Sequence, residues 1–187
     1  MLLRLVKEIE DSIAKECYLP ALFVTLTLPD ICGKAEFPGE PSNKKRYIGW
    51  YDKYLGRYEK KFASGADIGL ADRPYLSGEL VYQLRCSVLH EGNTDIVGSQ
   101  IKEEQNQISK FNLVIPKKNE WNAYGTSMSL DYAPNGEVMR REFEVDIPYL
   151  CKRISVVAKK YYEEHKEQFG FYSYNVFDER EKSEVEL

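Results

Sequence analysis

Histidine is scarce in this chain of 187 residues, which contains only His90 and His165. Sites that bind a metal ion through several imidazoles are therefore excluded, and acid–base chemistry near neutral pH must use one of these two side chains. The four cysteines stand far apart, with no C-x-x-C pair and no Cys/His cluster at the spacing of a zinc site. We therefore expect reduced thiols, no metal and no cofactor.

The chain also lacks a long apolar run and an excess of positive charge. Its longest apolar stretch, residues 18–28, is too short to cross the ~30 Å hydrocarbon core of a bilayer. Acidic residues interrupt the apolar N-terminus where a signal peptide needs a continuous run. Because 26 Lys and Arg face 30 Asp and Glu, the net charge is -4 and contact with a polyanion must be local. We expect a cytoplasmic protein with no part in a membrane.

The apolar residues that are present, 43% of the chain when tyrosine and cysteine are included, suffice for one hydrophobic core. Helical spacing predicts helices over residues 2–13, 44–62, 78–91 and from 147 onward. A nearly all-apolar helix over 21–32 is expected to bend or restart at Pro29 and to end at Gly33. Ser77 and Asp146 are placed to cap helix N-termini, and Gly92 is placed to end the fourth helix.

Before the last helix the hydrophobic period changes from helical to two, over residues 111–115, 124–132 and 137–145, with a turn at 134–136. The sequence therefore predicts a mainly α fold, an up-and-down helical bundle with a small antiparallel β insertion of a hairpin or three strands. We expect the insertion at about 109–146 within a single domain of residues 1–177. An acidic, flexible tail is expected at 178–187.

The segment 44–62 carries the strongest local positive charge, with seven basic residues against two acidic ones. Two interpretations are open. Its aromatic residues can pack into the core while the lysines solvate the outer face. Alternatively, its cations follow the phosphate backbone of a nucleic acid. The candidate phosphate-binding residues are Lys44, Lys45, Arg46, Lys53 and Arg57.

The fourth helix places Arg85 five residues before His90. Imidazole takes and gives protons near neutral pH, and a guanidinium binds phosphate oxygens. Two such pairs supply the base, the acid and the charge stabilisation that a 2′-hydroxyl needs to attack its own 3′-phosphate without a metal. On an ideal helix the two residues point about 140° apart. They therefore meet only if the helix end unwinds near Gly92, or if a second copy brings its own pair alongside.

The string from Tyr82 to Asn93, YQLRCSVLHEGN, resembles the signature helix of the HEPN superfamily, in which an arginine, usually a polar residue and a short spacer precede a histidine. The resemblance covers roughly residues 1–95 and the last helix. It implies a homodimer in which two motif helices face each other and form a metal-independent ribonuclease cleft, as in proteins that act as toxins or in phage defence. It also implies that Arg85 binds the phosphate and the transition state and that His90 is the acid–base residue. The supporting residues would be Cys86, Ser87, Glu91 and Asn93.

Cys86 departs from that pattern, because catalytic members often have Asn, Asp or His after the arginine. A thiol is a weak hydrogen-bond donor and cannot replace an amide in orienting a phosphate. The alternative is a catalytically inactive HEPN-like module that binds RNA, a nucleotide or a protein such as an antitoxin. His165 stands among charged residues at the end of the last helix, where we expect it to be solvent-exposed.

Overall fold

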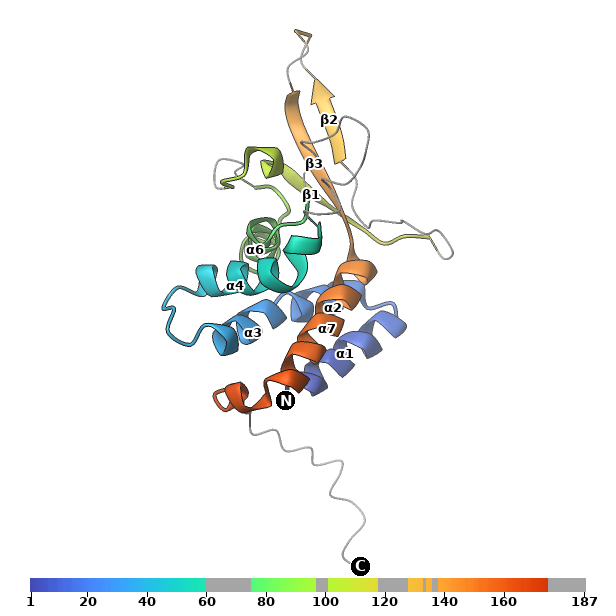
Figure 1. The fold of residues 1–187 in the computed structure, drawn as a ribbon. Helices are drawn as coiled ribbons and strands as arrows, with labels where there is room; N and C mark the ends of the chain where they lie inside the picture. Colours follow the sequence, from blue (N-terminus) through green and yellow to red (C-terminus); the bar gives the residue numbers. More distant parts are fainter. Residues whose placement is uncertain (60–74, 97–100, 118–127, 133, 136–137, 175–187) are drawn as a thin grey trace, which may run out of the picture.

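The computed structural model describes residues 1–59, 75–96, 101–117, 128–132, 134–135 and 138–174. Its elements, in chain order, are α1 (Leu2–Ala14), α2 (Tyr18–Thr25), α3 (Leu28–Glu36), α4 (Asn43–Tyr51), α6 (Gly78–Cys86), β1 (Lys110–Val114), β2 (Met128–Tyr132), β3 (Val138–Asp146) and α7 (Ile147–Glu164). Figure 1 shows the helices as one body with the small sheet projecting from one end. The mainly helical fold with a β insertion before the last helix confirms the prediction. The predicted tail, 178–187, lies outside the described residues.

Helix α7 is central to the helical body, where it packs against α1, α2 and α3. It follows β3 without a loop, because Asp146 ends the strand and its Oδ1 accepts a hydrogen bond from the Tyr149 amide at 2.9 Å. This is the predicted N-cap, and it satisfies one of the amides that a helix start leaves unbonded. One continuous hydrophobic core extends from Leu2 on α1 to Phe169 beyond α7.

Helices α2 and α3 divide the apolar segment near Pro29, as the sequence predicts. The prediction that Gly33 ends the helix is wrong, because α3 continues to Glu36. A Cβ atom on Gly33 would lie 2.6 Å from the carbonyl oxygen of Arg46 on α4. The glycine therefore allows the close approach of α3 and α4, instead of supplying a left-handed stop.

The predicted helix over 44–62 is α4 followed by a π-helical turn, Asp52–Gly56, and residues 60–62 lie outside the described part. Three of its aromatic residues, Tyr47, Trp50 and Tyr51, are fully buried. This burial confirms the core-packing interpretation for these three residues, whereas Tyr58 is exposed. At the π-helical turn, the Asp52 carboxylate accepts a hydrogen bond from the Gly78 amide at 2.7 Å, which joins this segment to the start of α6.

The strand order of the sheet is β1–β3–β2. Strands β2 and β3 pair in antiparallel fashion, as expected for the predicted turn between them, but β1 runs parallel to β3. The sheet is thus mixed instead of fully antiparallel. An alternating pattern identifies the two faces of a strand but not its neighbour, so it does not determine pairing direction. On the side of β1 that faces away from β3, the Ile96 amide donates to the Ser109 carbonyl at 2.9 Å and ties the segment after α6 to the sheet.

Candidate functional site

The motif helix begins and ends as the sequence predicts. The Ser77 hydroxyl accepts a hydrogen bond from the Leu80 amide at 3.3 Å, and Gly92 adopts a left-handed conformation with φ of 66°. Between Ser87 and Glu91 the helix widens into a π-helical turn. In such a turn the backbone hydrogen bond spans five residues instead of four, so side chains five positions apart approach each other.

This widened turn brings Arg85 and His90 together within one chain. Arg85 Nη1 lies 3.2 Å from His90 Nε2. The sequence left two ways for Arg85 and His90 to meet, a changed helix end or a second copy of the chain. The changed helix end is sufficient for this contact, and a second copy is not needed for it. A guanidinium can only donate hydrogen bonds, so His90 Nε2 is the acceptor in this contact. His90 is solvent-exposed and Arg85 is half-buried beneath it.

Asp30 is the third member of this cluster, and sequence reasoning missed it. Its Oδ2 lies 2.7 Å from Arg85 Nε, and the side chains of Asp30 and Arg85 are 26% and 21% exposed. Burial raises the pKa of the Asp30 carboxyl, and the attraction of Arg85 offsets only part of this rise. Burial alone would lower the pKa of Arg85, but Asp30 more than compensates and the net shift is upward. The available signal was that Asp30 is the one charged residue in the stretch 18–33.

Two tyrosines form the inner wall of the cluster. The rings of Tyr47 and Tyr82 meet edge to face at 5.3 Å, and the Arg85 guanidinium carbon lies 5.9 Å from the centre of the Tyr82 ring. The Tyr47 hydroxyl is fully buried, with no hydrogen-bond partner among the described residues. Burial, followed by the charge of Asp30, raises the pKa of Tyr47, so this hydroxyl stays neutral. The half-buried Cys86 thiol lies beside Tyr82 and, after burial, is the main cause of the raised pKa of that tyrosine.

The other supporting candidates hold the backbone after the motif helix. The buried Ser87 hydroxyl donates to the Asp95 carbonyl at 3.4 Å, and Asn93 Oδ1 accepts from the Asp95 amide at 3.1 Å. Glu91 is exposed at the helix end. Ser87 and Asn93 therefore fix the loop that leads to the sheet.

Two of the five basic candidates lie near this pair. The Lys44 ammonium is 5.7 Å from the centre of the Tyr82 ring, which Arg85 also approaches. The Arg46 guanidinium donates to the Glu40 carbonyl at 2.6 Å, and its positive charge reaches Asp30, where it lowers the carboxyl pKa.

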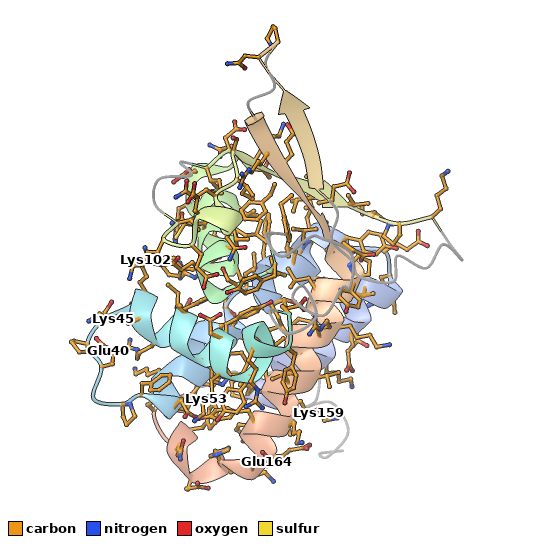
Figure 2. The ribbon with its side chains drawn as sticks, turned by 45° about the horizontal axis from the view of Figure 1, so that its top comes forward. Glu40, Lys45, Lys53, Lys102, Lys159 and Glu164 are labelled. Atoms are coloured by element: carbon orange, nitrogen blue, oxygen red, sulfur yellow. The ribbon has the colours of Figure 1, made fainter. Side chains whose placement is uncertain are left out.

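The other three basic candidates have partners of their own. Lys45 lies 3.8 Å from a Glu40 carboxylate oxygen, and Lys53 forms an ion pair with Glu36. Arg57 donates a hydrogen bond of 2.6 Å to the hydroxyl of the next residue. Figure 2 shows Lys45 beside Glu40 and Lys53 well apart from both. The structure therefore does not gather the five candidates into one row.

A comparison of this chain with protein-family models, with curated proteins and with solved structures finds no match. Among the described residues, no group of three or more His, Cys, Asp or Glu side chains is arranged to hold a metal ion. In the same part of the chain, no helix has the length and apolar character needed to cross a membrane.

The second histidine differs from the prediction. His165 is half-buried, because its ring stacks on Tyr161 at 4.4 Å and its Nδ1 donates to the Tyr161 carbonyl at 2.9 Å. The ring thus covers the end of α7 instead of standing free in solvent. This bond to a C-terminal helix carbonyl gives His165 a structural role and leaves His90 as the candidate for acid–base chemistry.

Proposed function

We propose that this protein is a metal-independent endoribonuclease of the HEPN type, which cleaves RNA between two motif helices of a homodimer. The observation that supports this function best is the 3.2 Å approach of Arg85 Nη1 to His90 Nε2 at an exposed helix end. A phosphate-binding cation and an imidazole are thereby close enough to each other to act on one phosphodiester.

In this proposal, His90 Nε2 accepts the proton of the RNA 2′-hydroxyl while Arg85 turns toward the scissile phosphate. The O2′–P bond forms and the P–O5′ bond breaks, and the guanidinium stabilises the added negative charge on phosphorus. The leaving O5′ takes a proton from an imidazolium. One imidazole cannot serve both sides of the phosphorus at once, so the second copy of His90 supplies this proton, which is why the proposal requires a homodimer. The products carry a 2′,3′-cyclic phosphate and a 5′-hydroxyl.

Asp30 acts in this scheme as a positioning residue for Arg85. Its carboxylate binds Nε and so holds the guanidinium beside His90, while the two terminal nitrogens stay available to the phosphate. An RNA substrate would be met in the cytoplasm, where the free cysteines of this chain stay reduced.

The test is cleavage of a single-stranded RNA by the purified protein in the presence of EDTA. His90→Ala and Arg85→Ala are each expected to reduce the rate by about 10²- to 10⁴-fold. The matched controls are His165→Gln and Arg4→Ala, because Arg4 lies on α1 in an exposed ion pair with Glu8. The 5′ fragment must end in a 2′,3′-cyclic phosphate, and a 2′-deoxy substitution at the cleaved nucleotide must block the reaction. Cleavage that survives in both motif variants would refute the assignment.

A second candidate function is a binding module that does not cleave. One observation favours it: the Asp30 carboxylate already occupies Arg85 Nε and opposes the approach of an anionic phosphate. Cys86, in place of a polar amide or imidazole, points the same way. RNA binding that persists in His90→Ala, with no cleaved product from the wild-type protein, would support this candidate over the ribonuclease.

A further inference from the structure

Two cations from different helices flank one aromatic ring beside the motif. Lys44 comes from the first turn of α4, and Arg85 comes from the last turn of α6. The Lys44 ammonium lies 5.7 Å and the Arg85 guanidinium carbon 5.9 Å from the centre of the Tyr82 ring. Each contact falls within the ~6 Å range in which a ring face attracts a cation. Tyr82 therefore holds Lys44 close to the candidate site.

Lys44 is the basic residue here whose charge is not already neutralised. It is exposed, and among the described residues no carboxylate lies within ion-pair distance of it. Its neighbour Lys45 differs, because it pairs with Glu40 and points to the outer side of α4. The acidic residue of the cluster, Asp30, is bonded to Arg85. The surface around Tyr82 is thus locally positive although the whole chain has a net charge of -4.

We infer that Lys44 binds the RNA phosphate adjacent to the one held by Arg85. This inference rests on the proposed RNA substrate and extends its contacts beyond the scissile bond. A phosphate is the expected ligand because an ammonium is a compact point charge that accepts many phosphate orientations. A stacked base is not expected, since the Tyr82 ring is half-buried and already meets Tyr47 and both cations. Such a backbone contact positions the strand without reading its sequence.

The test uses a single-stranded RNA that 2′-O-methyl groups make uncleavable. Its affinity for the protein is measured by fluorescence anisotropy over a range of salt concentrations. Lys44→Ala is expected to weaken binding about two- to fivefold. It is also expected to reduce the slope of log affinity against log salt by about 0.7, the value of one phosphate contact on a single strand. Lys45→Ala, one residue away on the same helix, is the matched control and is expected to leave both quantities unchanged.

Cleavage kinetics give an independent readout. Loss of a contact made equally in the ground state and the transition state raises KM and leaves kcat unchanged. If wild-type cleavage depends on His90 but Lys44→Ala and Lys45→Ala behave alike, the role of Lys44 is wrong and the ribonuclease stands. If binding depends on Lys44 while no variant or wild-type protein cleaves RNA, the ribonuclease is wrong and Lys44 retains its role. A wild-type protein that binds no RNA overturns both.

Discussion

Replacing Asp30 with alanine removes the carboxylate that joins α3 to the motif helix. The lost contact is an ion pair with a 2.7 Å hydrogen bond between side chains about three-quarters buried. A hydrogen bond to a charged group contributes about 1.5–3 kcal/mol, and breaking a fully buried ion pair costs about 3–5 kcal/mol. Because solvent reaches part of both side chains, we expect Asp30→Ala to lower the free energy of unfolding by about 2 kcal/mol.

Asp30→Asn separates the hydrogen bond from the charge. The amide oxygen of the asparagine can still accept a hydrogen bond from Arg85 Nε. The variant also has no carboxylate to bury, and it is burial that raises the pKa of Asp30 in the wild type. We expect its loss of stability at neutral pH to be about 1 kcal/mol or less. Above the ordinary carboxyl pKa of 3.8 and up to the raised value in the folded protein, the native state binds more protons than the unfolded chain. The contribution of Asp30 to stability is therefore greatest at low pH and falls as the pH rises through the folded pKa.

The assay measures the midpoint of urea unfolding by tryptophan fluorescence at several pH values between 3.5 and 7.5. A loss of 2 kcal/mol corresponds to a midpoint lower by about 1 M urea for a domain of this size. The stability of wild type relative to Asp30→Asn must decline as the pH rises above about 4. The reasoning is refuted by an unchanged midpoint for Asp30→Ala, or by a wild-type advantage over Asp30→Asn that grows with pH.

Three further substitutions test how the fold presents the site, each by thermal unfolding. Gly33→Ala places a Cβ atom 2.6 Å from the Arg46 carbonyl oxygen and is expected to cost about 2–3 kcal/mol, whereas Gly39→Ala meets nothing within 4 Å and is its control. Asp146→Ala removes the cap of α7 and is expected to cost about 1 kcal/mol; a melting temperature equal to wild type would contradict the capping role. Gly92→Ala forces a side chain into a left-handed conformation and should cost about 1–2 kcal/mol, so a stabilised variant would show that the turn is not strained by alanine.

Sequence reasoning predicted the features of this fold that depend on neighbouring residues. The caps at Ser77 and Asp146 and the stop at Gly92 each involve contacts within a few positions, so residue type and spacing are sufficient to identify them. The segment of α4 was assigned to a helix for the same reason, since its aromatic residues recur at helical spacing. The alternation before α7 likewise predicted strands, although not the parallel pairing of β1.

The features that sequence reasoning missed depend on residues far apart in the chain. Asp30 and Arg85 are separated by 55 positions, and no local pattern indicates that one binds the other. The sequence around Gly33 predicts a helix end, because the Arg46 carbonyl that the glycine faces belongs to another helix and leaves no local pattern. The difference between Lys44 and Lys45 is of the same kind. These adjacent lysines have different contacts because the fold brings Tyr82 to one and Glu40 to the other.

Because of the widened turn at Ser87–Glu91, the contact between the Arg85 guanidinium and the His90 imidazole depends on the pitch of the helix between them. A regular α-helix brings together residues four positions apart, and a π-helical turn does so for residues five apart. A chain shortened by one residue between Arg85 and His90 would therefore keep the pair in contact if this turn reverted to α-helix. A chain lengthened by one residue would lose the contact. The number of residues between the two side chains and the local pitch of the helix must change together.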